Sequence, residues 1–252
     1  MNKKSSTKQV PDSLIIKNSI RYDVPLDIIM SVIEIESSDD ANARRYEKHL
    51  DKNDSDTPGV DDGNKEDDAS YGPMQILGAT ARTLGFVGDF DGLFNPACGI
   101  KFGTKYLRWC FSHYGEISNY DERWKFAVAA YNAGRGDINK MLLKARRKES
   151  EFEKKTINIS MPGKWQLWNY SSHLLESVTG SASKYTLNYI EKLNKLQKKY
   201  REFMETDEDF IGKVIAHINY TIDINRKLVA IVPGLKTMYS ALPEYVIKYR
   251  RP

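Results

Sequence analysis

The segment Leu26–Ser37, read LDIIMSVIEIES, places the strongest constraint on the fold of this chain. Its apolar residues recur at i, i+3, i+4 and i+7, and they are Leu26, Ile29, Met30 and Ile33. This spacing predicts an α-helix with one apolar stripe. Glu36 falls on that stripe, whereas Glu34 points to the opposite side of the helix.

Glu36 is therefore the first candidate for a catalytic residue. A carboxyl group beside apolar surface has its charged form disfavoured, so we expect burial on the stripe to raise its pKa. An acid that stays protonated near neutral pH is what general acid catalysis requires. The alternative is a structural glutamate at a helix end, which reaches solvent or pairs with Arg44 or Arg45.

The composition is that of a globular protein, because 252 residues with 40% hydrophobic content can bury a core. The net charge of +4 is too small to indicate nucleic-acid binding, but it is compatible with an anionic polymer such as a cell wall. Residues 51–68 carry a net charge of −6 and residues 184–201 one of +5. We interpret these stretches as a solvated loop and a solvated helix face.

No metal, cofactor or membrane span is expected. Cys98 and Cys110 lie in one predicted helix, about 18 Å apart by its rise per residue, so they cannot pair with each other. Free thiols fit a protein made in a reducing cytosol, and neither the cysteines nor the histidines have a metal-ligand spacing. The first 16 residues lack the apolar core of a Sec signal peptide, and no apolar run could span a membrane.

Further helices are predicted along the chain. Asp12 or Ser13 is expected to cap a helix that ends near Tyr22, and Asn95-Pro96 has the form of a cap followed by a proline at the first helical position. A later apolar stripe contains Trp124, Ala127, Val128 and Tyr131. A buried tyrosine hydroxyl and a buried carboxyl group each need a partner, so Tyr131 and Glu36 are a candidate pair. The alternative is a core tyrosine whose hydroxyl bonds to backbone.

Residues 51–68 contain Pro58, Gly59 and Gly63, and they are predicted to form an acidic surface loop. Just before this loop, Glu47 is a rival carboxylate, for which an ion pair with a neighbouring arginine is the first expectation. Three more stretches complete the predicted organisation. They are a flexible N-terminus at 1–11, an insertion at 148–182, and an extension at 201–252 that is either a docking appendage or the last packed helices.

Five segments stand in a recognisable order: Glu36-Ser37, Ser70–Gln75, Thr80-Ala81, Asn95-Pro96 with Gly103–Leu107, and Ala130–Gly134. Together they resemble the soluble lytic transglycosylase (SLT) domain, a lysozyme-like domain also related to goose-type lysozyme. Thr186–Ile190 is similar to the closing tyrosine motif of that family. The resemblance covers residues 12–200.

The resemblance implies a mainly α-helical domain with a cleft that binds the glycan strands of peptidoglycan. Glu36 would be the acid and base of a lytic transglycosylase that leaves a 1,6-anhydro end on N-acetylmuramic acid, and Tyr131 would hydrogen-bond to it. The residues that would contact substrate or shape the pocket are Ser37, Ser70, Tyr71, Met74, Gln75, Asn132 and Tyr189.

Three features depart from the family pattern. Pro73 stands where leucine is usual, Arg135 stands where proline often follows Asn-Ala-Gly, and the acidic loop is long. Goose-type muramidases have water-activating aspartates near this segment, so Asp67 or Asp68 could convert the reaction to hydrolysis. We expect both aspartates to be solvated, which favours the lyase reaction. Glu47 stays a secondary candidate, because its surroundings resemble stretches of phage muramidases.

A non-enzymatic role is the competing interpretation, since virion and secretion-apparatus proteins can retain such a domain as a structural or wall-binding module. Without a Sec signal, we expect the protein to reach the wall by another route, such as carriage in a phage particle. The extension at 201–252 could then contact other virion or secretion proteins.

Overall fold

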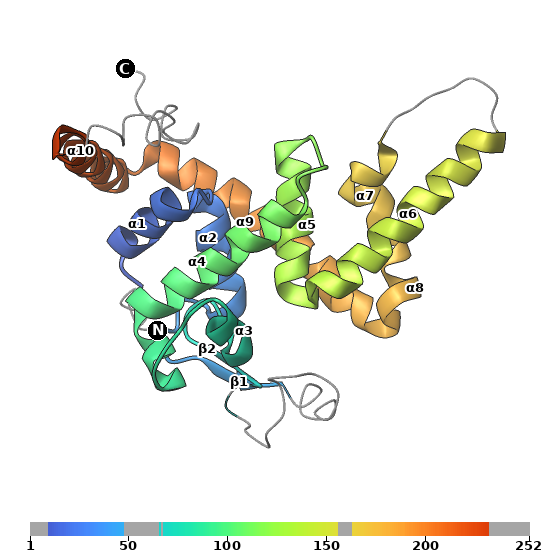
Figure 1. Cartoon of the computed structure of the whole chain (residues 1–252), viewed down its shortest axis with the longest axis horizontal. Helices are drawn as coiled ribbons and strands as arrows, with labels where there is room; N and C mark the ends of the chain where they lie inside the picture. The colour runs from blue at the N-terminus through green and yellow to red at the C-terminus, as the bar shows by residue number, and fades with distance from the viewer. Residues whose placement is uncertain (1–9, 48–65, 67, 156–162, 232–252) are drawn as a thin grey trace, which may run out of the picture. The chain divides into compact units, whose positions relative to one another are not determined.

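The computed structural model describes residues 10–47, 66, 68–155 and 163–231. These residues are mainly helical, which confirms the predicted fold class (Figure 1). The chain divides into two compact units: unit 1 comprises Met1–Lys105 and Leu196–Pro252, and unit 2 comprises Tyr106–Lys195. Within the described part of the chain, no helix combines the length and the apolar character that crossing a membrane requires.

Unit 1 begins with two packed helices, α1 (Asp12–Tyr22) and α2 (Leu26–Ser37). Asp23 ends α1 in the left-handed conformation, with φ 53°, and Pro25 occupies the N-cap of α2. The bounds of α2 are those predicted from its apolar stripe. The expected side-chain cap of α1 is not made, because Pro11 stands at its N-cap position.

A small antiparallel sheet follows, with strand order β1-β2-β3. It is formed by β1 (Arg44–Tyr46), β2 (Ala69–Tyr71) and β3 (Ile76–Leu77). Arg45 pairs with Ser70, and Ser70 pairs in turn with Leu77. The strands have two or three residues each, too few to show the alternation that marks a strand in a sequence, and we did not predict them.

After the sheet, unit 1 continues with α3 (Gly78–Thr83) and the 3₁₀ turn η2 (Phe90–Phe94). The long helix α4 (Pro96–His113) begins in unit 1 and continues into unit 2. The predicted cap of α4 is confirmed: Asn95 Oδ1 accepts a hydrogen bond from the backbone N–H of Ala97 at 2.9 Å.

Unit 1 is completed by the end of α9 (Ser183–Thr206) and by α10 (Glu208–Ile231), which packs against α1. Phe210, Val214 and Ile218 are buried, and Lys213 Nζ lies 3.3 Å from Asp12 Oδ2. The described part of the extension is therefore a packed helix of unit 1, and its contact with other proteins stays a prediction.

Unit 2 is built on α5 (Tyr120–Ala133) and α6 (Arg135–Lys155). Gly134, with φ 84°, separates them. The predicted insertion contains the short elements η3 (Lys164–Gln166), α7 (Trp168–Ser171), η4 (Ser172–Leu174), α8 (Glu176–Thr179) and η5 (Gly180–Ala182). The buried Glu149 of α6 holds this segment, because its carboxylate accepts the backbone N–H groups of Lys164 and Trp165.

Candidate active site

The end of α2 is fixed to the turn Gly72–Gln75. Ser37 Oγ donates to Pro73 O at 2.8 Å and lies 3.1 Å from Ile33 O, one turn back in its own helix. Glu36, the preceding residue, is half-buried, as the position of its side chain on the apolar stripe predicted. The serine thus fixes the backbone that carries the candidate acid.

The turn itself is held by backbone contacts and by one amide side chain. Gly72 has φ +71°, and a Cβ atom there would lie 2.3 Å from Leu93 O, so a side chain has no room at this position. Gln75, with φ 45°, donates from Nε2 to Ala43 O at 2.8 Å and to Gly72 O at 3.0 Å. Both N–H groups of this amide therefore hold the turn.

Met74 lies beneath α4 and has no exposed surface. Thr104 Oγ1 lies 3.7 Å from its sulfur, and a Cβ atom on Gly103 would lie 2.6 Å from that sulfur. Helix α4 therefore approaches Met74 closely at Gly103. Met74 is buried in this conformation, and its contact with sugar stays a prediction.

Tyr71 and Ser70 lie in β2 and are also buried, since β2 is the middle strand of the sheet. The Tyr71 hydroxyl donates to Glu66 O at 2.7 Å, and the Arg44 guanidinium lies over its ring at 5.2 Å from the centroid. Burial raises the pKa of Tyr71 above its ordinary value. Tyr71 therefore packs within the sheet in this conformation, and its contact with substrate stays a prediction.

Two carboxylates lie beside this sheet. Glu47 accepts a hydrogen bond from Arg45 Nε at 2.6 Å, which confirms the predicted ion pair, and Ser70 Oγ lies 3.3 Å from the same oxygen. Asp68 is only 2% exposed, so the prediction that it is solvated is wrong. Its backbone carbonyl accepts the N–H of Glu47 at 2.9 Å, which draws residue 68 into the edge of the sheet. Asp67 lies outside the described residues.

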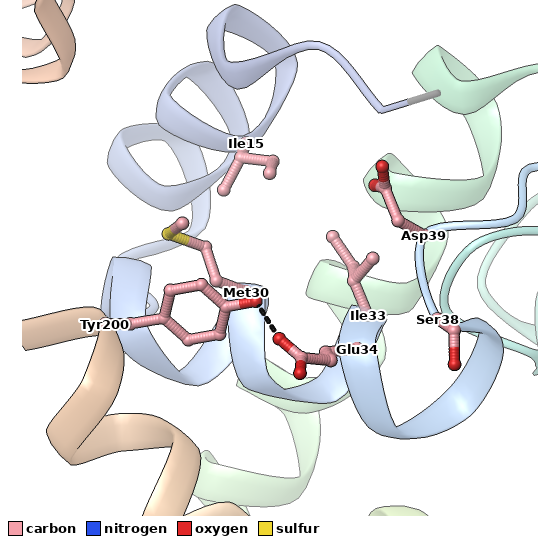
Figure 2. Close-up of a pocket in the computed structure, with 7 residues that line it drawn as sticks. All are labelled: Ile15, Met30, Ile33, Glu34, Ser38, Asp39 and Tyr200. Atoms are coloured by element: carbon pink, nitrogen blue, oxygen red, sulfur yellow. Dashed lines mark hydrogen bonds between the residues drawn. The ribbon is translucent and has the colours of Figure 1, made fainter. Parts of the chain in front are cut away.

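The other side of α2 carries Glu34, as predicted. Its carboxylate accepts a hydrogen bond from Lys199 Nζ at 2.8 Å. It also accepts one from the Tyr200 hydroxyl, which is the dashed line in Figure 2. Burial alone would raise the pKa of Glu34, but these two hydrogen bonds outweigh it and hold the pKa below its ordinary value. Next to this group lies a cavity of about 230 Å³, with Ile15, Met30 and Ile33 as its apolar wall.

The remaining candidates belong to unit 2. Tyr131 is buried at the end of α5, and its ring centroid lies 5.1 Å from that of Tyr106. Asn132 Oδ1 accepts a hydrogen bond from Thr186 Oγ1 at 3.0 Å, which links α5 to α9, and Tyr189 is buried. Because Tyr131 and Glu36 belong to different units, their hydrogen bond stays a prediction.

Several supporting residues were not identified as such from the sequence. Thr104 beneath the turn and Arg44 over the Tyr71 ring become visible only once the elements are packed. No group of three or more histidine, cysteine, aspartate or glutamate side chains in the described ranges is arranged to bind a metal ion. The side chains described at this site carry carboxyl, hydroxyl and amide groups.

A family model described as "Transglycosylase SLT domain" matches residues 13–157. The matched range contains the end of α2, the turn Gly72–Gln75 and the Tyr131-Asn132 segment. It ends before Tyr189 and α10.

Proposed function

Since the chain belongs to the transglycosylase SLT domain family, whose model matches more than half of it, we propose that it is a peptidoglycan lytic transglycosylase with Glu36 as its acid and base. Membership gives the chain a peptidoglycan-acting function of the lytic transglycosylase type. The bond cleaved and the roles of the residues are our proposal. The observation that carries it is the fixed position of Glu36, half-buried at an α2 end that Ser37 anchors to Pro73.

The proposed reaction breaks the β-1,4 bond between N-acetylmuramic acid and N-acetylglucosamine. The Glu36 carboxyl donates its proton to the bridging oxygen as the bond from C1 to that oxygen breaks. The 6-hydroxyl oxygen of the muramoyl residue then bonds to C1, and its proton passes to the Glu36 carboxylate. The enzyme regains its starting protonation state and no water is consumed, so one carboxyl group is enough.

The other candidates divide into positioning residues and residues that contact the sugar. Ser37, Met74 and Gln75 bond or pack within the protein, and we propose that they hold Glu36 and the turn in place. Positioning of this kind contributes to rate because a small displacement of a catalytic group is costly. We propose that Tyr131 bonds to Glu36, and that Asn132 and Tyr189 shape the sugar pocket, in keeping with the family resemblance.

Hydrolysis is the second candidate, and the burial of Asp68 favours it. A muramidase needs a group that activates or orients water, and a second carboxylate is the usual choice. We expected no second carboxylate that is shielded from solvent, but Asp68 is 2% exposed and the Glu47 side chain is 18% exposed. Glu47 is also held by Arg45 and Ser70, so it has a defined orientation.

Digestion of purified sacculi in heavy-oxygen water distinguishes these reactions. We expect 1,6-anhydromuramoyl ends that carry no solvent oxygen, as read by mass spectrometry of the released fragments. One solvent oxygen per cleavage would show a muramidase, and Glu47→Gln and Asp68→Asn would then identify the second carboxylate. Binding to sacculi without release of fragments would show a non-catalytic wall-binding module.

A further inference from the structure

Arg135 is a positive charge at the start of α6 that the proposed reaction leaves without a role. It directly follows Asn132-Ala133-Gly134, at the place where the family pattern often has proline. Proline carries no charge, so the guanidinium adds a chemical group that the family pattern does not require. The side chain is half-buried in unit 2.

Two contacts with α4 hold this guanidinium. It lies over the Trp109 ring at 4.1 Å from the centroid, and its Nη1 lies 3.5 Å from Nδ1 of His113, one turn further along α4. A planar guanidinium stacks well on an aromatic face, which restricts the conformations of the side chain. The charge is therefore held in place before a ligand binds, and binding costs less conformational entropy.

The charge of Arg135 has no carboxylate partner among the residues that the structure describes. Asp137, two residues further along α6, pairs with Lys140 at 3.0 Å. Glu116, which follows α4, pairs with Arg146. A fixed guanidinium without a counter-charge favours an anionic ligand, because carboxylate or phosphate oxygens accept charge-assisted hydrogen bonds from its N–H groups.

A row of aromatic rings connects this charge to Tyr131. The Trp109 ring stacks on Tyr106 with centroids 5.7 Å apart, and the Tyr106 centroid lies 5.1 Å from that of Tyr131. Burial and the Cys110 thiol raise the pKa of Tyr106, whereas the positive charge of Arg135 lowers it. The guanidinium is therefore linked, through packed rings, to a residue of the proposed site.

The surroundings of Arg135 are open to a ligand. A Cβ atom added to either neighbour, Gly134 or Gly136, would meet no atom within 4 Å. The Trp109 side chain is 43% exposed, and Asn132, which we propose for the sugar pocket, is exposed as well. A ligand can therefore approach this part of unit 2 from solvent.

We propose that Arg135 binds a carboxylate on the lactyl side chain of an N-acetylmuramic acid residue, and so selects muramoyl-containing strands over uncharged glycans. The sugar rings of peptidoglycan carry hydroxyl and acetamido groups, so its negative charge lies on the lactyl groups and on the peptides that they bear. The carboxylate is the lactyl carboxyl itself where no peptide is attached, and otherwise a carboxylate of the peptide. In naming this substrate the inference rests on the proposed function, whereas the preference for an anion rests on the contacts of Arg135.

Monosaccharide probes test the proposal on the full chain, because they contain no glycosidic bond that could be cleaved. N-acetylmuramic acid carries the lactyl carboxylate, and its methyl ester is the matched uncharged control. In NMR titrations we expect the acid to shift the signals of Trp109, His113 and residues 134–136. We expect it to bind about tenfold more tightly than the ester, which cannot accept charge-assisted hydrogen bonds.

Variants of Arg135 test whether this residue supplies the preference. Arg135→Gln should weaken binding of the acid about tenfold, to the affinity of the ester, and leave binding of the ester unchanged. Arg135→Lys should keep part of the preference, because lysine retains the charge but neither the planar fork nor its stacking on Trp109. Arg147→Gln, at an exposed site on the same helix, is the matched control and should change neither affinity.

A second pair of probes distinguishes the two sources of the carboxylate. N-acetylmuramoyl-L-alanyl-D-isoglutamine carries its free carboxylate on the peptide, and its methyl ester is again the uncharged control. A preference for N-acetylmuramic acid over its ester identifies the lactyl carboxyl as the ligand. A preference for the acid in the peptide-bearing pair alone identifies the peptide carboxylate.

Three results would overturn the proposal. They are equal affinities of acid and ester in both pairs, a preference that survives Arg135→Gln, and an equal loss of acid and ester binding in that variant, which would show a structural arginine. Absence of the preference together with normal release of fragments from sacculi would leave the proposed function intact. A preference without any release would support this role of Arg135 and contradict the proposed cleavage.

Discussion

The two sides of α2 are held in different ways. On the side toward α9, carboxylates make the contacts: Asp27 Oδ2 accepts from Gln197 Nε2 at 3.0 Å and from Arg201 Nε at 2.7 Å, and Glu34 accepts from Lys199 and Tyr200. At its C-terminal end, α2 meets the turn Gly72–Gln75 through a serine hydroxyl and a backbone carbonyl.

This difference separates the proposed chemistry from the ionic contacts that support the fold. Ion pairs weaken when the carboxylate is protonated or when salt screens its charge. Hydrogen bonds from hydroxyl and amide groups to carbonyl oxygens are not weakened by either change. Glu36 must gain and lose a proton in each proposed turnover. The surroundings of a carboxyl group that changes its protonation state should be held by contacts that do not depend on pH. The hydrogen bonds of the Ser37 hydroxyl and the Gln75 amide to backbone carbonyls meet that condition.

The largest expected effect contrasts Glu36 with Glu34 on the same helix. Glu36→Gln removes the transferable proton and little volume, so we expect the release of fragments from sacculi to fall by about 10² to 10⁴ with an unchanged melting temperature. For Glu34→Gln we expect near-normal release of fragments and a slightly lower free energy of unfolding. A folded Glu36→Gln protein with normal turnover would refute the assignment. Loss of activity in Glu47→Gln instead would transfer the role to Glu47.

The second prediction concerns the turn. Gly72→Ala places a Cβ atom 2.3 Å from Leu93 O at φ +71°, and we expect the free energy of unfolding to fall by about 2 to 5 kcal/mol. The matched control is Gly85→Ala, where φ is +90° but no atom lies within 4 Å of the new Cβ. It should lose only about 1 to 2 kcal/mol, from backbone strain. Equal losses in urea unfolding would mean that the turn can move away from η2.

Much of the fold could be predicted because its signals are local. The apolar period gave the bounds of α2, and Asn95-Pro96 gave the start of α4. The sheet was missed because its strands are too short to show a period. The burial of Asp68 was missed because a window of acidic residues predicts solvation, whereas pairing of β1 with β2 draws this one residue inward.

The candidate site could be predicted only in part, for a similar reason. Glu36 is visible in the sequence because it lies on an apolar stripe, but the bond from Ser37 to Pro73 joins residues 36 positions apart. Met74 and Tyr71 were assigned to the substrate through the motif that contains them. In the structure these residues form part of the turn and the sheet beside it, and their buried side chains pack against that turn.

The third prediction tests the proposed hydrogen bond between the Tyr131 hydroxyl and the Glu36 carboxyl group. Tyr131→Phe removes only the hydroxyl that we propose bonds to Glu36. We expect about a tenfold loss of activity and a shift of one limb of the pH profile, since that bond would favour one protonation state of the carboxyl group. Tyr120→Phe, at an exposed site on the same helix, is the control. A Tyr131→Phe profile that superimposes on the wild type would argue against the contact.

The smallest effect tests the ionic side of α2 directly. The pKa of Glu34 is lowered in the folded protein from an ordinary value of 4.5, so its stabilising contribution is present above about pH 4.5 and is lost as the pH falls through the lower, folded pKa. The side chain is 37% exposed, so solvent screening limits this contribution to less than about 1 kcal/mol. The free energy of unfolding should therefore differ between wild type and Glu34→Gln at pH 7, and the difference should shrink as the pH falls below about 4.5 and through the folded pKa. Salt at 1 M should shrink it as well, because the Debye length falls to about 3 Å. A difference that grows as the pH falls would show that Glu34 is held in its protonated form, and the contrast between the two sides of α2 would then be lost.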